Sequence, residues 1–141
     1  MIGRPIAIGD NKTGASGAIP RESIKERNRH AELYYEEIRK RTSDVAKIAN
    51  NTAFTEHEIA TIKRHIFIDK HRFADGKYER FREEYEIAQT WQRLQEDNGT
   101  ENDLLLLNHE LLEFRLMRRY NIVYDKAHSI TNRKYNWEET I

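Results

Sequence analysis

Two short stretches of this sequence hold histidines and carboxylates close enough together for proton transfer or metal binding. One holds His65, Asp69 and His71 as H-x3-D-x-H, and the other is the run NHELLE, with His109, Glu110 and Glu113. Residues four apart share one face of a helix, so His65 would neighbour Asp69 and His109 would neighbour Glu113. A carboxylate beside an imidazole fixes its tautomer and raises its basicity, as a general base or a metal ligand requires. Both stretches are therefore candidate catalytic sites.

The run NHELLE is similar to the H-E-x-x-H helix of metalloproteases, except that Glu113 stands at the position of the second histidine. His109 and Glu113 could bind a divalent metal at this spacing, with Glu110 beside them. The further ligands that such a site needs would come from His65, His71 or His128. The alternative is a buried polar pair, but a histidine and a carboxylate in the most apolar helix are costly without partners. We expect no resident cofactor, with this divalent metal as the alternative.

The remaining histidines differ in their surroundings. His65 also lies on an apolar stripe with Ile62, so a structural role for its ring stays open. His30 and His57 stand among charged residues and are predicted to lie on the surface. His128, in the run KAHS, is a further candidate for catalysis.

Three other residues are candidates for holding a substrate. Arg93 is the only basic residue between Glu83 and Glu113, and its planar guanidinium can bind two phosphate oxygens at once. It could instead neutralise nearby carboxylates. Lys70 would add positive charge, and Trp91 offers a ring for base stacking, although aromatic residues at helical spacing are mostly core.

The net charge is zero, with 24 Lys and Arg against 24 Asp and Glu, but the charges are unevenly spread. Residues 63–82 carry seven basic and three acidic side chains. Residues 83–113 carry one basic and nine acidic side chains, and residues 115–134 carry six basic and one acidic. Pairing between acidic and basic helices, or simple solvation, would explain this pattern. The two basic segments could instead form a cationic face that holds phosphates.

The composition excludes several classes of protein. With 141 residues the chain suits one small domain, and the absence of cysteine removes disulfides, thiolate metal sites and a catalytic thiol. No run approaches the roughly 18 apolar residues of a membrane span, and the first residues lack the apolar core of a secretory signal. We therefore expect a cytoplasmic or virion-associated protein with no membrane partner. P-loop, G-x-G-x-x-G, G-x-S-x-G and calcium-loop patterns are missing, which argues against kinases, dehydrogenases, lipases and EF-hands.

The elements that must position these residues are predicted to be helical almost throughout. Residues 1–20 hold four of the six glycines and both prolines, which predicts a flexible leader before a single helical domain over 21–141. Apolar periodicity predicts helices of residues 21–40, 44–49, 55–66, 85–94, 100–117 and 124–134. Residues 64–72 fit either a helix end or a short extended piece, and Asp75-Gly76 predicts a turn. The predicted fold is an all-α, compact bundle of about six helices.

Several runs arrive in an order that resembles a known group of proteins. They are HAELYYEEIRKRTSDVAKIANNTAFTEHEI, IKRHIFIDKH, YEIAQTWQRL, LLLLNHELLEFRLM and YDKAHSITNRKYNW. Over residues 28–137 the chain resembles the C-terminal domain attached to some phage minor head proteins of the Mu F-like group, and similar domains at the ends of polymorphic toxins. The resemblance implies that the polar positions of these runs form the site, namely His65, His71, Arg93, His109, Glu110, Glu113 and His128.

The association with such toxins gives the first hypothesis, in which the chain is an effector domain that acts on nucleic acid. We expect RNA as the substrate and an immunity protein as the partner. His109 and His65 would transfer protons, which requires the two histidine clusters to converge in one cleft. Charge stabilisation and orientation would fall to Arg93, Lys70, His71, Glu110 and Glu113.

Two other hypotheses stay open. In one, the chain is a non-enzymatic module that binds phage head proteins or another protein, and the clusters are buried structural networks without a cleft. In the other, it is a metal-dependent hydrolase that uses His109, Glu113 and another histidine.

Overall fold

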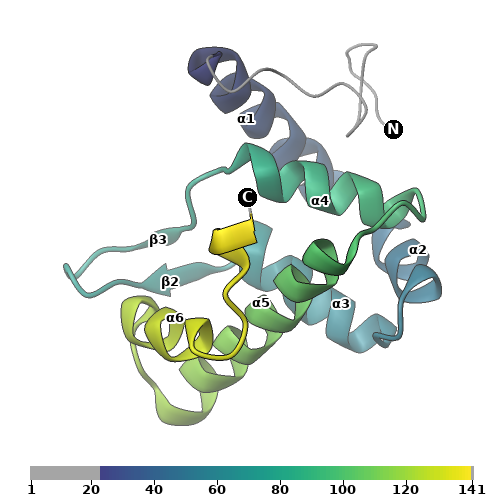
Figure 1. Cartoon of the computed structure of the whole chain (residues 1–141). Coiled ribbons are helices and arrows are strands. Elements are labelled where there is room, and N and C mark those ends of the chain that lie inside the picture. Colours follow the sequence, from purple (N-terminus) through teal and green to yellow (C-terminus); the bar gives the residue numbers. More distant parts are fainter. Residues whose placement is uncertain (1–22, 141) are drawn as a thin grey trace. The chain divides into compact units, whose positions relative to one another are not determined.

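The computed structural model describes residues 23–140, so the predicted leader over 1–20 lies outside the described residues. The α-helices are α1 (Ile24–Lys40), α2 (Asp44–Asn51), α3 (Glu56–Lys63), α4 (Tyr85–Gln95), α5 (Glu101–Tyr120) and α6 (Tyr124–Asn132) (Figure 1). The other elements are the π-helical turn η2 (Arg64–Ile68), the strands β2 (Lys70–Arg72) and β3 (Tyr78–Arg80), and the 3-10 turn η3 (Trp137–Thr140). The predicted all-α class with about six helices is confirmed. None of the described helices combines the length and the apolar character needed to cross a membrane.

The described residues divide into two compact units. The first comprises residues 23–53 and 82–99, with α1, α2 and α4. The second comprises residues 54–81 and 100–140, with α3, η2, the two strands, α5, α6 and η3.

In the first unit α4 packs against both α1 and α2. Trp91 of α4 is fully buried, and its indole N–H donates to Asp44 Oδ2 over 3.0 Å. The other oxygen of Asp44 accepts a hydrogen bond from the Val45 amide at 3.0 Å. The carboxylate at the start of α2 thus serves both its own helix and the indole of α4, which ties these two helices together.

In the second unit α5 packs against α3 and α6. Two capping boxes fix where α3 and α5 begin. The Thr55 hydroxyl accepts from the Glu58 amide at 3.1 Å, and the Thr100 hydroxyl accepts from the Asp103 amide at 3.2 Å. The carboxylates of Glu58 and Asp103 accept in return from the two threonine amides.

The segment between α3 and the strands takes a form that sequence periodicity did not predict. The Asp69 amide donates to the Arg64 carbonyl at 2.7 Å, five residues back, so α3 widens into η2 before the chain becomes extended. Strands β2 and β3 then pair antiparallel around the predicted Asp75-Gly76 turn, where Gly76 has a φ of 92°. Three-residue strands are too short to show an alternating pattern in the sequence.

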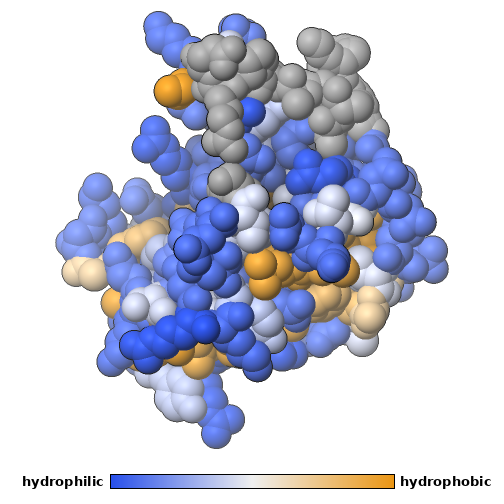
Figure 2. Space-filling view, viewed as in Figure 1, coloured by the Kyte–Doolittle hydropathy of each residue, from blue (hydrophilic) through white to orange (hydrophobic). Residues whose placement is uncertain are grey.

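The leucine-rich start of α5 is only partly buried. Leu104 is 37% exposed, whereas Leu106 and Leu107 are fully buried. Further along α5 the buried side chains include the polar His109 and Glu113 beside Leu111. Most of the face in Figure 2 is hydrophilic, in keeping with the high content of charged residues.

Candidate functional site

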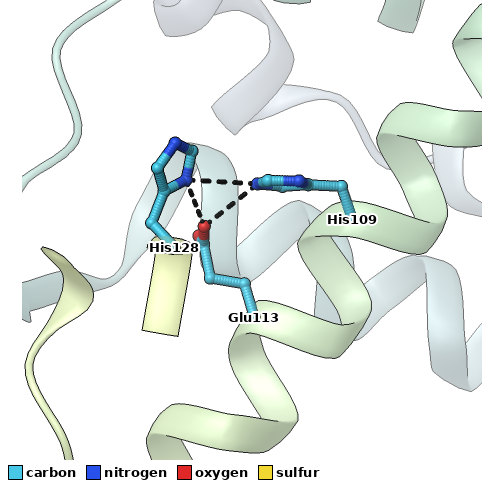
Figure 3. A group of neighbouring side chains, drawn as sticks. All are labelled: His109, Glu113 and His128. Carbon is cyan, nitrogen blue, oxygen red and sulfur yellow. Dashed lines mark hydrogen bonds and ion pairs between the residues drawn. The ribbon is translucent and has the colours of Figure 1, made fainter. Parts of the chain in front are cut away.

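The Glu113 carboxylate lies at the centre of a buried cluster in the second unit. Its side chain is 1% exposed. Oε1 lies 2.8 Å from His65 Nε2, and Oε2 lies 2.8 Å from His128 Nδ1 and 3.1 Å from His109 Nε2. Figure 3 shows His109 and Glu113 projecting from one helix towards His128, which belongs to α6. The two histidine clusters of the sequence therefore meet at one carboxylate.

The three imidazoles determine the charge of this carboxylate. Burial alone would raise the pKa of Glu113, but hydrogen bonds with His109, His128 and His65 pull that pKa well below its usual range. Glu113 is therefore ionised at neutral pH. A buried carboxylate is tolerated because each oxygen faces a ring nitrogen.

His109 and His128 are also held from outside the cluster. His109 Nδ1 donates to the Tyr135 carbonyl at 2.7 Å, and His128 Nε2 lies 3.0 Å from Glu138 Oε1. The hydrogen bond with Glu113 raises the pKa of His128 to about 9, against the effect of burial and with help from Glu138. Both nitrogens of His128 therefore face carboxylates, which favours the imidazolium form in the absence of any other cation.

His71 lies behind His65, which contacts Glu113 directly. His71 Nε2 donates to the His65 carbonyl at 2.7 Å, so in the neutral ring the lone pair is on Nδ1. Burial and the nearby His65 lower the pKa of His71, which keeps its ring neutral at pH 7. The His71 ring also stacks on Phe81, with ring centroids 4.2 Å apart. These contacts orient His71 through β2 and the end of η2.

A pocket of about 370 Å³ opens beside these two histidines within the second unit. Its walls come from η2, the strands and the C-terminal half of α5. The residues lining it are His65, Asp69, Lys70, His71, Arg72, Tyr78, Phe114, Met117, Arg118, Asn121 and Ile122. Its charged lining is mainly cationic, since it includes Lys70, Arg72 and Arg118 but only one carboxylate, that of Asp69. The electrostatics suit an anionic ligand.

The structure brings together most of the residues singled out from the sequence. His65, His109, Glu113 and His128 share the cluster, and His71 and Lys70 line the pocket. Glu110 stands at the edge of the cluster, with Oε1 3.7 Å from His65 Nε2 and Oε2 3.8 Å from His109 Nε2. His65 and Asp69, expected as helical neighbours, are separated by the change from η2 to extended chain.

Trp91 and Arg93 belong to the first unit. The Trp91 indole is fully buried, so in this conformation its ring has no exposed face on which a base could stack. Arg93 Nη2 donates to Thr90 Oγ1 at 3.1 Å. The Trp91 indole thus has a structural contact with α2, and Arg93 has one within α4.

Sequence reasoning missed the groups that hold the cluster from outside. A backbone carbonyl such as that of Tyr135 leaves no mark in the sequence, and Glu138 follows His128 by ten residues without a recognisable motif. Arg72 and Arg118 were visible only as members of two basic segments. Comparison of the chain with protein-family models, with curated proteins and with solved structures finds no match.

Proposed function

We propose that the second unit cleaves phosphodiester bonds in nucleic acid, with RNA as the substrate and its 2′-hydroxyl as the nucleophile. The observation that carries this proposal is a cationic pocket whose wall includes a neutral, oriented imidazole, that of His71. Such a combination supplies what phosphodiester cleavage needs, namely a base beside a group of phosphate-binding cations.

The cationic side chains suit the phosphate backbone. Lys70 and Arg72 come from β2, and Arg118 comes from the last turn of α5. Arg72 Nη2 donates to the Asn121 carbonyl at 3.1 Å and to the Asn121 side-chain oxygen at 2.7 Å, so its position is fixed. Fixed positive charge attracts phosphates and stabilises the charge that develops on them during attack.

His71 is the best-placed general base. Its Nε2–H is engaged by the His65 carbonyl, which leaves the Nδ1 lone pair to accept a proton. In RNA, the base would take the proton of a ribose 2′-hydroxyl, whose oxygen attacks the adjacent phosphorus. The bond to the 5′-oxygen then breaks, and that oxygen takes a proton from water. DNA lacks this nucleophile, which is the reason for proposing RNA.

The buried cluster has a supporting role in this scheme. Both nitrogens of His109 are occupied within the cluster, and His65 Nε2 faces Glu113. The proton-transfer roles first considered for His109 and His65 therefore pass to His71, whose orientation depends on the His65 carbonyl. Such an activity would suit an effector domain. The non-enzymatic alternative expects a buried network with no cleft, and the pocket argues against it.

The test is cleavage of labelled single-stranded RNA by the purified chain. We expect products ending in a 2′,3′-cyclic phosphate, and His71→Ala should lower the rate by about 100-fold or more, as expected on removal of a general base. His57→Ala, at an exposed histidine of α3, is the matched control and should cleave normally. Circular dichroism would confirm that both variants are folded. No cleavage by the wild-type chain, or equal cleavage by His71→Ala, would refute the proposal.

A further inference from the structure

The hydrogen bonds of His109 show which of its two ring nitrogens carries a proton. Its Nδ1–H donates to the Tyr135 carbonyl, because a carbonyl can only accept. In the neutral ring, the Nε2 lone pair then faces Glu113 Oε2 at 3.1 Å. Glu113 and His109 are almost fully buried, with side chains 1% and 3% exposed. A cation at this point, either a second proton on His109 or a metal ion, would satisfy both lone pairs.

The three innermost atoms have the spacing of metal ligands. Glu113 Oε2 and His128 Nδ1 are 2.8 Å apart, Glu113 Oε2 and His109 Nε2 are 3.1 Å apart, and the two ring nitrogens are 3.2 Å apart. Ligands at about 2.1 Å from one ion lie about 3.0 Å apart in octahedral geometry and about 3.4 Å apart in tetrahedral geometry. A point about 2.1 Å from all three atoms exists, about 1 Å from the plane that they define.

The outer contacts of the ligands are those that metal-binding histidines usually have. A ligating histidine commonly gives its second ring nitrogen to a carbonyl or a carboxylate, which fixes the ring and its tautomer. His109 meets the Tyr135 carbonyl in this way, and His128 meets Glu138. The second oxygen of Glu113 is likewise held, by His65 Nε2 at 2.8 Å.

We propose that His109 Nε2, Glu113 Oε2 and His128 Nδ1 bind one divalent transition-metal ion, of which Zn²⁺ fits best. Two imidazoles and one carboxylate suit Zn²⁺, whereas Mg²⁺ and Ca²⁺ prefer oxygen ligands throughout. Three protein ligands leave a fourth coordination position for water. The neighbouring group of His65, Glu110 and Glu113 is looser, with His65 Nε2 and Glu110 Oε1 3.7 Å apart, so one ion is assigned.

This inference does not depend on the proposed RNA cleavage, since metal binding is measured without a substrate. The whole chain, stripped with a chelator and dialysed, would be titrated with Zn²⁺ by calorimetry and with Co²⁺ by visible absorption. We expect one equivalent to bind with a Kd in the micromolar range or below, and millimolar Mg²⁺ to leave this binding unchanged. Absence of Zn²⁺ binding by the wild-type chain would overturn the inference.

Three variants separate this site from adventitious binding. His128→Ala removes one ligand and should weaken Zn²⁺ binding by more than about 100-fold, beyond the 10- to 100-fold typical of losing an outer partner. Glu138→Gln keeps an acceptor oxygen but removes the negative charge of that outer partner, and should weaken binding by about 10-fold, the lower end of the effect of losing such a partner. His57→Ala changes an exposed histidine and should bind like the wild type.

Glu138 is largely exposed, so its variant keeps the test decisive if His128→Ala does not fold. Unchanged Zn²⁺ binding in a folded His128→Ala chain, or in Glu138→Gln, would overturn the inference. Metal binding without RNA cleavage would refute the proposed function alone, and RNA cleavage without metal binding would refute this inference alone.

Discussion

Replacing Glu113 by Gln removes the negative charge on which three imidazoles converge, and its effect can be worked out from the structure. The carboxylate is 1% exposed and contacts His65, His109 and His128. Removing one partner from a buried charged network typically costs about 3 to 5 kcal/mol of unfolding free energy. We expect Glu113→Gln to lose this amount at pH 7 in chelator-treated, metal-free protein. Total stabilities of about 5 to 15 kcal/mol are common, so the variant should still fold.

The same substitution should change the pH dependence of stability. The pKa of His128 is raised from 6.5 to about 9 in the folded chain, so its contribution is complete below pH 6.5 and is lost as the pH rises through 9. This shift corresponds to about 2 to 3 kcal/mol, allowing for partial solvent screening at the ring. Burial lowers the pKa of His71, whose contribution is instead lost as the pH falls below 6.5, so His71 affects only the acid end of the pH range measured.

Urea unfolding of the metal-free chain, followed by circular dichroism between pH 6 and pH 10, measures both effects. The wild type should lose about 2 to 3 kcal/mol across this range, and Glu113→Gln should lose much less, because the hydrogen bond with Glu113 is the main cause of the raised pKa. A variant within about 1 kcal/mol of the wild type at pH 7 would show that the cluster is not a coupled charge network. Parallel pH profiles for the two proteins would equally refute the reasoning.

Four other predictions concern the elements around the site and the metal. Asp44→Ala removes the acceptor of the buried Trp91 indole N–H and should lower the unfolding free energy by about 1 to 3 kcal/mol in urea titrations. Thr100→Ala breaks the capping box of α5 and should cost about 1 kcal/mol by the same assay, whereas a Thr100→Ser control should stay near the wild type. Gly76→Ala should cost about 1 kcal/mol through its positive φ alone, since no atom lies within 4 Å of the added carbon; a neutral result would contradict the left-handed turn. Zn²⁺ at about 100 times its Kd should raise the Tm by roughly 10 °C in a thermal scan, and Glu138→Gln should show a smaller rise at the same Zn²⁺ concentration.

The helical elements could be predicted from the sequence because their signals are local. Apolar spacing and capping residues depend on neighbours within four positions, as at Thr55 and Glu58, so α3 begins where the sequence indicates. The π-helical turn η2 was not predictable, and the choice between a helix end and extended chain over residues 64–72 stayed open, because contacts from distant segments hold this region. The Ala74 amide, for example, donates to Asp125 Oδ1 at 2.8 Å, 51 residues along the chain.

In the candidate site, too, some contacts follow from local spacing in the sequence and others only from tertiary packing. The four-residue spacing of His109 and Glu113 is sequence information, since any helix places both on one face. That His65 reaches the same carboxylate from 48 residues away is decided only by the packing of α5 against α3 and η2. The pairing of His109 with the Tyr135 carbonyl is equally a result of tertiary structure, since every residue carries a carbonyl and only the fold selects one.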